Sequence, residues 1–161
     1  MASMRAVVQR VSRAAVSWDG DDGRHQRQEI GAGLAVLVGA GPDDDLADAG
    51  DLADKVAQLR IFSDAAGRFN LSLEDVRGEA LVVSQFTLYA DATRGRRPSF
   101  IGAAAPDCAR QLCQRFADRL TERGIGTRTG SFGARMTVSM DNDGPVTIAL
   151  STDPWETRIR A

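Results

Sequence analysis

Residues 81–91 have the sequence Leu-Val-Val-Ser-Gln-Phe-Thr-Leu-Tyr-Ala-Asp, in which an apolar run typical of a β-strand is followed by hydroxyl, amide, aromatic and hydroxyl side chains. A strand that only fills a core has little use for Ser84, Gln85 and Thr87 in close succession, because a buried polar group costs free energy unless it finds a partner. The run therefore indicates either a functional site or an edge strand whose hydroxyls bond to neighbouring backbone. Strand alternation places Gln85 and Thr87 on one side and Ser84 and Phe86 on the other, unless the strand bends there.

The composition is that of one domain large enough to bury its own core. The chain has 161 residues, of which 43% are apolar and 26% charged; this fits the size and composition of single globular domains. Apolar runs such as residues 34–38 are too short to span a bilayer, and residues 1–5 lack the apolar region of a secretory signal. We therefore expect a cytoplasmic protein with no membrane partner.

Periodic patterns predict several strands and two helices. Residues 43–45 are three aspartates, which we interpret as the N-terminal cap of a helix with an apolar stripe from Ala49 to Leu59 rather than as a metal site. Pro106 begins a second helix, which ends before Gly124. The first expected strand is 7–11, and 14–18 is its continuation or its antiparallel neighbour. The others are 28–30, 34–39, the run from 81, 136–140 and 146–150, with a turn or short hairpin over 61–70. These elements predict an α+β fold, with the helices packed on an antiparallel β barrel or a pair of sheets.

The few cysteines and the single histidine exclude several mechanisms. Cys108 and Cys113 are five positions apart in the second helix, so they do not pair easily with each other and are expected to be small core residues. His25 lies in a polar, glycine-rich stretch typical of a hairpin tip. A histidine-based triad or a zinc site would lack its usual residues, and the chain has no P-loop and no Rossmann glycine pattern.

An arginine-rich segment follows the opening run. Arg94, Arg96 and Arg97 surround a glycine in residues 93–100, and planar guanidinium groups suit phosphate oxygens. The alternative is a solvated loop. Because the formal net charge is -2, affinity for RNA would have to come from this local patch rather than from the field of the whole protein.

The segment 142–147, Asn-Asp-Gly-Pro-Val-Thr, contains Gly144-Pro145 directly before a predicted strand. The pair is typical of a turn. Proline is also the residue that readily accepts a cis peptide, which would re-aim the neighbouring carbonyls and let them recognise the amino group of a substrate and its handedness.

Four blocks of the chain resemble, in order and in spacing, the D-aminoacyl-tRNA deacylases, also called D-tyrosyl-tRNA deacylases. They are residues 4–11 (MRAVVQRV), 84–90 (SQFTLYA), 95–100 (GRRPSF) and 142–147 (NDGPVT). The resemblance implies one deacylase domain over residues 4–150, with residues 1–3 as a leader or alternative start and residues 151–161 as a C-terminal extension past the family's last strand. The hairpin of residues 18–28 looks longer and more polar than is usual in the family.

The resemblance also implies an activity. The family's members are cytoplasmic homodimeric hydrolases, so the chain is expected to cleave the ester between a D-amino acid and the 3′ end of tRNA. It is also expected to remove glycine mischarged on tRNA-Ala. The aminoacyl-tRNA is then the partner molecule, the products are free D-amino acid and tRNA, and no metal or organic cofactor takes part.

Site residues carry over from the family onto matching positions. Thr87 would lie beside the scissile carbonyl, while Ser84, Gln85 and Phe86 would shape the pocket and donate hydrogen bonds to the developing oxyanion. In the family the site lies at the dimer interface. Gly144-Pro145 would enter the partner's pocket as a Gly-cisPro element whose carbonyls hold the α-amino group, so that an L side chain clashes.

The residues themselves constrain the mechanism. Thr87 has no histidine to deprotonate it, so its hydroxyl is a weak nucleophile. An aminoacyl ester is already activated, and we expect Thr87 to orient the carbonyl or a water while the 2′-hydroxyl of the terminal adenosine assists. One alternative is a non-catalytic RNA-binding module. It would lack a platform on which bases stack, because aromatic residues are 6% of the chain. The other alternative is a proofreader of mischarged L-amino acids with a trans Gly-Pro peptide.

Overall fold

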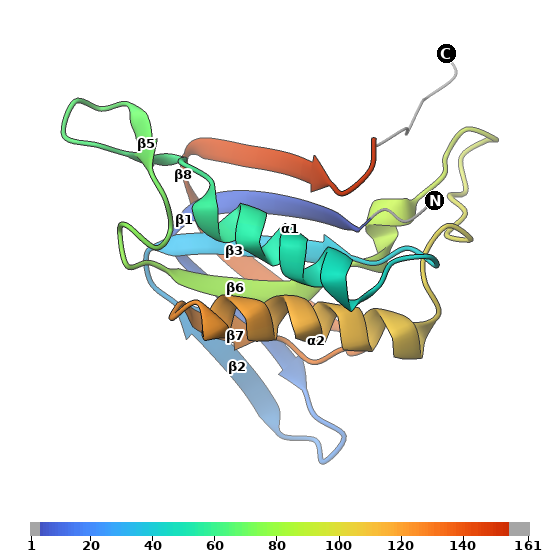
Figure 1. Cartoon of the computed structure of the whole chain (residues 1–161). Helices are drawn as coiled ribbons and strands as arrows, with labels where there is room; N and C mark the ends of the chain where they lie inside the picture. Colours follow the sequence, from blue (N-terminus) through green and yellow to red (C-terminus); the bar gives the residue numbers. More distant parts are fainter. Residues whose placement is uncertain (1–3, 155–161) are drawn as a thin grey trace.

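The computed structural model describes residues 4–154, which form a mixed α+β fold with two α-helices packed on one face of a strongly curled sheet (Figure 1). The sheet has six strands in the order β2-β1-β3-β6-β7, and β8 pairs with the other edge of β1. The elements are β1 Arg5–Asp19, β2 His25–Ile30, β3 Gly33–Gly39, α1 Leu46–Gln58, β4 Phe62–Ser63, β5 Phe69–Leu71, β6 Glu79–Ser84, the 3₁₀ helix η1 Phe86–Tyr89, α2 Pro106–Glu122, β7 Gly126–Thr129 and β8 Met136–Ser151.

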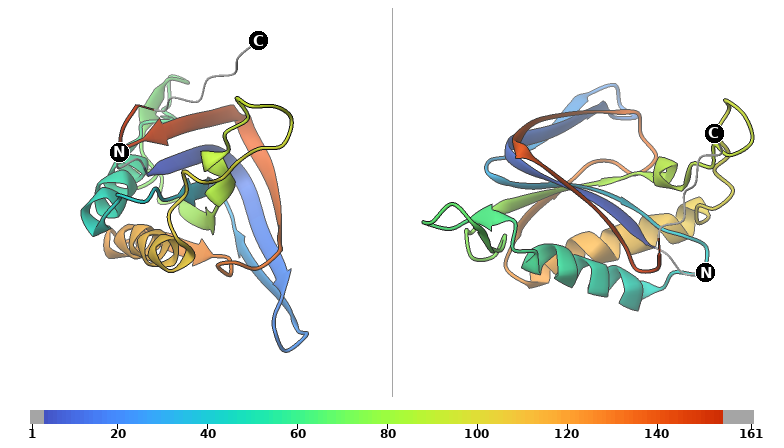
Figure 2. Two further views of the ribbon diagram at one scale, coloured as in Figure 1. Left: turned by 90° about the vertical axis from the view of Figure 1, so that its right-hand side faces the viewer. Right: turned by 90° about the horizontal axis from the view of Figure 1, so that it is seen from above.

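The long strand β1 organises the sheet. Its first half pairs with β3, its second half pairs with β2, and β8 runs antiparallel to it along nearly its whole length. The sheet therefore curls into a barrel that is nearly closed (Figure 2). The α+β class and the two packed helices are as predicted. The sheet is mixed rather than purely antiparallel, because β3–β6 and β6–β7 are parallel pairs that are connected through the helices.

The helices begin where the sequence predicts. The Asp45 carboxylate accepts a hydrogen bond from the Asp48 N–H, and the Asp48 carboxylate accepts one from the Asp45 N–H, each at 2.9 Å. This reciprocal capping box confirms that the acidic run caps α1. Pro106 is the first residue of α2, where its missing N–H costs no hydrogen bond.

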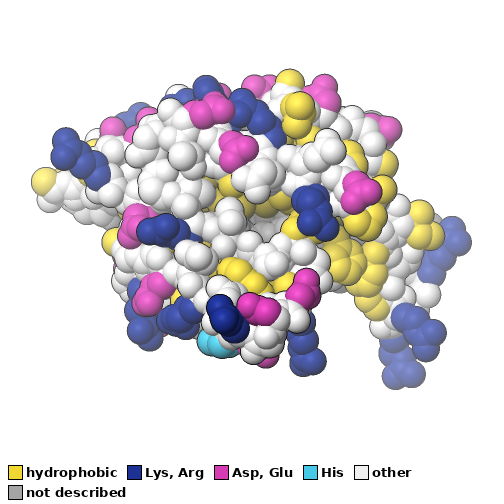
Figure 3. Space-filling model, turned by 90° about the horizontal axis from the view of Figure 1, so that it is seen from below, with side chains coloured by type: hydrophobic (Ala, Val, Ile, Leu, Met, Phe, Trp, Pro, Cys, Tyr) yellow, Lys and Arg dark blue, Asp and Glu magenta, His cyan; other side chains and the backbone are white. Residues whose placement is uncertain are grey.

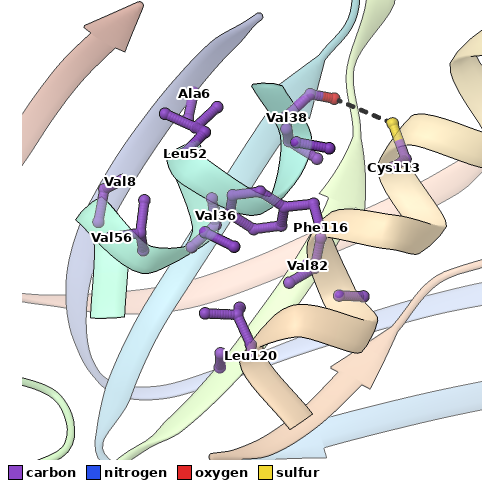
Figure 4. Packing of buried hydrophobic residues seen from close by; sticks show 14 of the residues in the cluster. Ala6, Val8, Val36, Val38, Leu52, Val56, Val82, Cys113, Phe116 and Leu120 are labelled. Carbon is purple, nitrogen blue, oxygen red and sulfur yellow. Dashed lines mark hydrogen bonds between the residues drawn. The ribbon is translucent and has the colours of Figure 1, made fainter. Parts of the chain in front are cut away.

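The main core lies between the helices and the sheet. Phe116 and Leu120 of α2 meet Leu52 and Val56 of α1 and rest on Val36 of β3 (Figure 4). Phe116 and Leu120 are fully buried, and burial of one such side chain contributes about 1.5–3 kcal/mol to folding.

A second core fills the inside of the curl. It joins Val16 of β1 and Ile30 of β2 to Leu81 and Val83 of β6, while Val82 faces the helices. Strand β6 is therefore buried on both faces, which explains why its apolar run is continuous rather than alternating.

Two local predictions are wrong, and one strand was missed. Residues 86–89 form η1 instead of continuing the strand, and 136–140 and 146–150 are parts of one strand, β8, with an irregular register near residue 142. The polar strand β7 was not predicted. The predicted leader 1–3 and residues 155–161 of the predicted extension lie outside the described residues. No helix in the described part is both long and apolar enough to cross a membrane.

Both cysteines have the structural role expected for them. Cys113 is buried, and its thiol donates to the carbonyl oxygen of Val38 at 3.8 Å (Figure 4). Cys108 is half-buried and packs against the main core. His25 lies just after the turn of the β1–β2 hairpin, where it is exposed and contacts Asp19.

Candidate active site

The chain bends sharply where β6 ends. The Gln85 N–H donates to the Val38 carbonyl at 2.8 Å, which extends the pairing with β3 by one residue, and η1 begins at the next position. The buried Tyr89 hydroxyl donates to the Gly39 carbonyl at 3.1 Å and holds η1 against β3. A side chain at Gly39 would collide with the Tyr89 ring, since a Cβ there would lie 2.9 Å from it. Long-range contacts therefore fix the bend.

An apolar pocket of about 380 Å³ opens at this bend. Its walls come from the end of β3, the start of α2 and the loop before β8. The lining residues are Val38, Gly39, Ala40, Ser84, Gln85, Phe86, Phe100, Ala103, Ala104, Pro106, Ala109, Cys113, Phe132 and Gly133. Such a mostly apolar pocket with a few polar groups is the usual form of a small-molecule site.

The structure brings the predicted catalytic residues together. Ser84, Gln85 and Phe86 line the pocket. Thr87 is exposed beside it, and the side-chain amide of Gln85 donates to the Thr87 hydroxyl. The bend explains how residues from both faces of a strand reach one place. Phe86 rests edge-on against Phe100, with 5.2 Å between the ring centroids, and remains 55% exposed.

Part of the pocket was missed in the sequence. Phe132 comes from a loop with the sequence Gly-Ser-Phe-Gly at 130–133, and an aromatic between glycines was the one available signal. Cys113 is also in the wall. Burial raises the pKa of its thiol to about 12, so the thiol stays protonated and inert at neutral pH.

Gly144-Pro145 lies in the irregular part of β8, and its peptide bond is cis, as expected. Arg10, which is buried, donates from Nε to the Asp143 carbonyl at 2.9 Å and from Nη1 to the Ile61 carbonyl at 2.8 Å. The Asn142 side chain accepts from the Val146 N–H at 2.8 Å. The two flanking anchors leave Gly144 and Pro145 themselves exposed.

Gly144-Pro145 and the pocket do not meet within one chain. Along the strand direction, the pair lies at the height of Arg10 of β1, which pairs with Leu34 of β3. The pocket begins further along β3, at Val38, which pairs with Ser84 of β6. Four residues of strand separate the two levels, about 13 Å. β8 and β6 are also separated by β1 and β3. In Figure 1 the β4–β5 hairpin, which follows Ile61, lies at the opposite end of the molecule from η1.

The predicted RNA contacts lie on an exposed loop next to the pocket. Arg94, Arg96 and Arg97 are all exposed, and paired hydrogen bonds between Asp91 and Ser99 close the loop. Figure 3 shows hydrophobic side chains around a hollow on one face of the molecule, with basic side chains beside them.

Two solved structures share this architecture. One, titled c-Myc DNA Unwinding Element Binding Protein, matches with a TM-score of 0.82 and 35% identity over 94% of this chain and 99% of that chain. The other, titled a probable eukaryotic D-amino acid tRNA deacylase, matches with a TM-score of 0.79 and 18% identity over 92% and 99% of the two chains. The chain is thus in the class of α+β proteins that these structures represent, two helices on a curled sheet.

Sequence comparison narrows this class to one family. Residues 7–151 match the family described as D-Tyr-tRNA(Tyr) deacylase. A protein named D-aminoacyl-tRNA deacylase from Roseiflexus castenholzii is 56% identical over 92% of this chain and 92% of its own length. A protein of the same name from Thermotoga petrophila is 52% identical over 92% of this chain and 97% of its own length. The chain belongs to the D-Tyr-tRNA(Tyr) deacylase family, as the four sequence blocks predicted.

Proposed function

We propose that the protein is a D-aminoacyl-tRNA deacylase, which hydrolyses the ester between a D-amino acid and the 3′ end of tRNA. The pocket at the end of β6 carries the proposal, because it gathers Ser84, Gln85 and Phe86 of the family motif and has Thr87 at its rim. The relatives that are 50–56% identical bear this activity as their name. The enzyme would act during translation in the cytoplasm, with residues 4–150 as its one catalytic domain.

The pocket suits the end of an aminoacyl-tRNA. Its apolar walls suit a nucleoside and an amino-acid side chain, while the polar groups of Ser84 and Gln85 lie at one place, the bend. The first turn of a helix leaves backbone N–H groups without an intrahelical acceptor. Those of Phe86 and Thr87 at the start of η1 are therefore the candidate donors to an oxyanion at the rim.

Hydrolysis needs little activation by the protein. A water oxygen bonds to the carbonyl carbon, the bond to the ribose 3′-oxygen breaks, and a proton passes from the water to that leaving oxygen. The Thr87 hydroxyl already accepts a hydrogen bond from Gln85, which fixes its orientation. We assign Thr87 to orienting the carbonyl or the water and assign assistance to the 2′-hydroxyl of the terminal adenosine; this chain needs no metal or organic cofactor for these steps.

A second copy of the chain would complete the site. Gly144-Pro145 is exposed, is held in place by Arg10 and lies far from the pocket of its own chain. In a symmetric dimer each pair would enter the other chain's pocket. The carbonyls there would hold the α-amino group, so an L side chain would be directed into protein and rejected. Glycine has no side chain to reject, so glycyl-tRNA-Ala is expected to be a substrate as well.

The deciding experiment compares deacylation of D-Tyr-tRNA, L-Tyr-tRNA and Gly-tRNA-Ala by the purified protein. We expect hydrolysis of the first and third only. RNA binding without hydrolysis of any ester would contradict the enzyme assignment, and hydrolysis of L-Tyr-tRNA would contradict the chiral filter.

The role of Thr87 needs a second comparison. Thr87→Ser and Thr87→Ala are assayed on normal D-Tyr-tRNA and on tRNA whose terminal 2′-hydroxyl has been removed. We expect Thr87→Ser to stay close to wild type and loss of the 2′-hydroxyl to slow every variant. Complete loss with Thr87→Ala together with no effect of the 2′-hydroxyl would make Thr87 the nucleophile instead.

A further inference from the structure

The guanidinium group of Arg110 lies over the ring of Phe132, with 5.0 Å between Cζ and the ring centroid. Arg110 is in the second turn of α2, and Phe132 belongs to the loop before β8. A guanidinium over an aromatic face is attracted to the ring, while its N–H donors remain available for hydrogen bonds to another group. The stack therefore leaves the Arg110 donors available to a ligand.

Arg110 and Phe132 also line a small pocket of about 80 Å³ beside the main one. Its polar lining consists of Ser84, Arg110, Gln114 and Thr129, which are one cation and three neutral groups. No carboxylate lines it, and among residues 4–154 Arg110 has no ion pair. By contrast, Arg115 of the same helix is paired with Glu122 at 2.7 Å. The small pocket therefore suits an anion.

The small pocket adjoins the proposed active site. Ser84, Cys113 and Phe132 line both pockets, so one ligand can extend from one into the other. If the ester lies at Ser84–Thr87 and the terminal nucleoside occupies the main pocket, the next group along the substrate is the phosphodiester on the 5′ side of that nucleoside. A phosphodiester carries the charge and the paired oxygens that a guanidinium binds best.

We propose that Arg110, held by Phe132, binds the phosphodiester that precedes the terminal nucleoside of the tRNA. The inference rests on the proposed function and makes Arg110 a substrate-binding residue that reads the nucleic-acid part of the substrate. It is independent of the amino acid and of its handedness.

The test compares three substrates that differ only beyond the nucleoside: D-Tyr-tRNA, 3′-O-D-tyrosyl-adenosine 5′-monophosphate and 3′-O-D-tyrosyl-adenosine. For Arg110→Gln we expect kcat/KM to fall about tenfold or more on the two phosphorylated substrates, through KM, because a charged hydrogen bond is lost. On the unphosphorylated nucleoside the change should stay below about twofold, because the contact does not exist there. Arg110→Lys should recover part of the loss, since lysine keeps the charge without the planar fork.

The matched control is Arg115→Gln, which removes a cation of the same helix that Glu122 already neutralises. For this variant, kcat/KM on all three substrates should stay at the wild-type value.

Two outcomes would overturn the proposal. An equal loss on all three substrates with Arg110→Gln would show that Arg110 only supports the pocket wall, and the absence of any loss would show that it does not bind the substrate. Calorimetric binding of adenosine 5′-monophosphate and adenosine to wild type and Arg110→Gln tests the contact even if no ester is cleaved, which separates it from failure of the proposed function.

Discussion

Arg10 donates from Nε to the carbonyl oxygen of Asp143 at 2.9 Å, directly before the Gly144-Pro145 pair. Its Nη1 donates to the Ile61 carbonyl at 2.8 Å, and the Phe69 ring lies 5.4 Å from its Cζ. One buried side chain thus joins the irregular part of β8 to the start of the β4–β5 hairpin. If Gly144-Pro145 enters the pocket of a second copy, as proposed, this anchor holds it in place beforehand and avoids the conformational entropy that ordering it on arrival would cost.

Replacing Arg10 tests this anchor. In Arg10→Ala two carbonyls lose their donor, and we expect the free energy of unfolding to fall by about 1–3 kcal/mol. Discrimination between D-Tyr-tRNA and L-Tyr-tRNA should narrow as well, because the pair is no longer held. Denaturant unfolding and deacylation rates measure the two effects. The control Arg13→Ala breaks an exposed, solvent-screened ion pair with Asp141 and should leave both the free energy of unfolding and the discrimination close to wild type; equal behaviour of the two variants would remove the special role of Arg10.

The arginine loop is expected to contact the tRNA backbone. Arg96 and Arg97 are exposed, so the double variant Arg96→Gln, Arg97→Gln should fold normally. We expect it to bind tRNA more weakly, and the salt dependence of log Kd should flatten by about one to two units. Filter binding at several salt concentrations measures this, with Arg24→Gln in the distant β1–β2 turn as control. Unchanged tRNA binding would assign the two residues to contacts with a second copy.

Cys113 should resist alkylation in the folded protein. Because burial raises the pKa of its thiol to about 12, only about one thiol in ten thousand is ionised at pH 8, and the thiolate is the reactive form. Iodoacetamide followed by mass spectrometry should therefore label the half-buried Cys108 first and Cys113 only after unfolding. Rapid labelling of Cys113 in native protein would mean that this wall of the pocket opens.

Much of the fold follows from local patterns. The aspartate cap, Pro106 at the start of α2 and the apolar stripes each act within one or two helical turns, so they could be recognised in the sequence. The apolar run of Leu81 to Val83 likewise indicated a strand, and the structure shows that this strand is buried on both faces.

The features that were missed depend on distant contacts. Nothing local distinguishes Phe86 to Tyr89 from a strand; the bend is held by Tyr89 on Gly39 and by the Arg5 guanidinium, which donates to the Leu88 carbonyl at 2.7 Å. Likewise, β8 continues through residues 141–145 because β1 and Arg10 pair with it from more than a hundred residues away. The polar side chains of Ser84, Gln85 and Thr87 marked a candidate site, and the family resemblance assigned their roles. By contrast, Phe132 joins the main pocket, and Arg110 the small one beside it, only in three dimensions.

The two helices are joined by a carboxylate whose effect on stability depends on pH. Arg119 donates two hydrogen bonds to Asp54 of α1, at 2.7 and 3.2 Å, and these chiefly hold the pKa of Asp54 below its ordinary value. A folded-state pKa below the unfolded one stabilises the protein above the unfolded pKa, and the gain is lost as pH falls through the folded value.

Asp54→Asn should therefore lower the free energy of unfolding at pH 7 by about 1 kcal/mol or less, since the pair is partly exposed. The difference from wild type should shrink as pH falls below the unfolded-state pKa of about 4 and should disappear once pH has passed through the lower folded-state pKa of Asp54. Denaturant titrations at pH 7 and pH 3 measure it. A difference that is the same at both pH values would mean that Asp54 stabilises the fold by packing rather than by charge.

A shared active site predicts that two defective proteins can restore each other. One variant carries Gln85→Ala and Thr87→Ala in the pocket; the other carries Gly144→Ala, where a Cβ would meet the Val146 nitrogen at 2.8 Å and the backbone φ of 148° disfavours any side chain. Each alone should be nearly inactive. After mixing and subunit exchange, half of the dimers are mixed, and each has one site with an intact pocket and an intact partner pair, so roughly a quarter of wild-type activity should return.

The size of both variants by gel filtration and their unfolding midpoints serve as controls for folding and assembly. If the pocket and the Gly144-Pro145 pair of the same chain worked together, every site in the mixed dimer would contain one defect. Activity would then stay at the level of the separate variants, and the proposal that the partner completes the site would have to be abandoned.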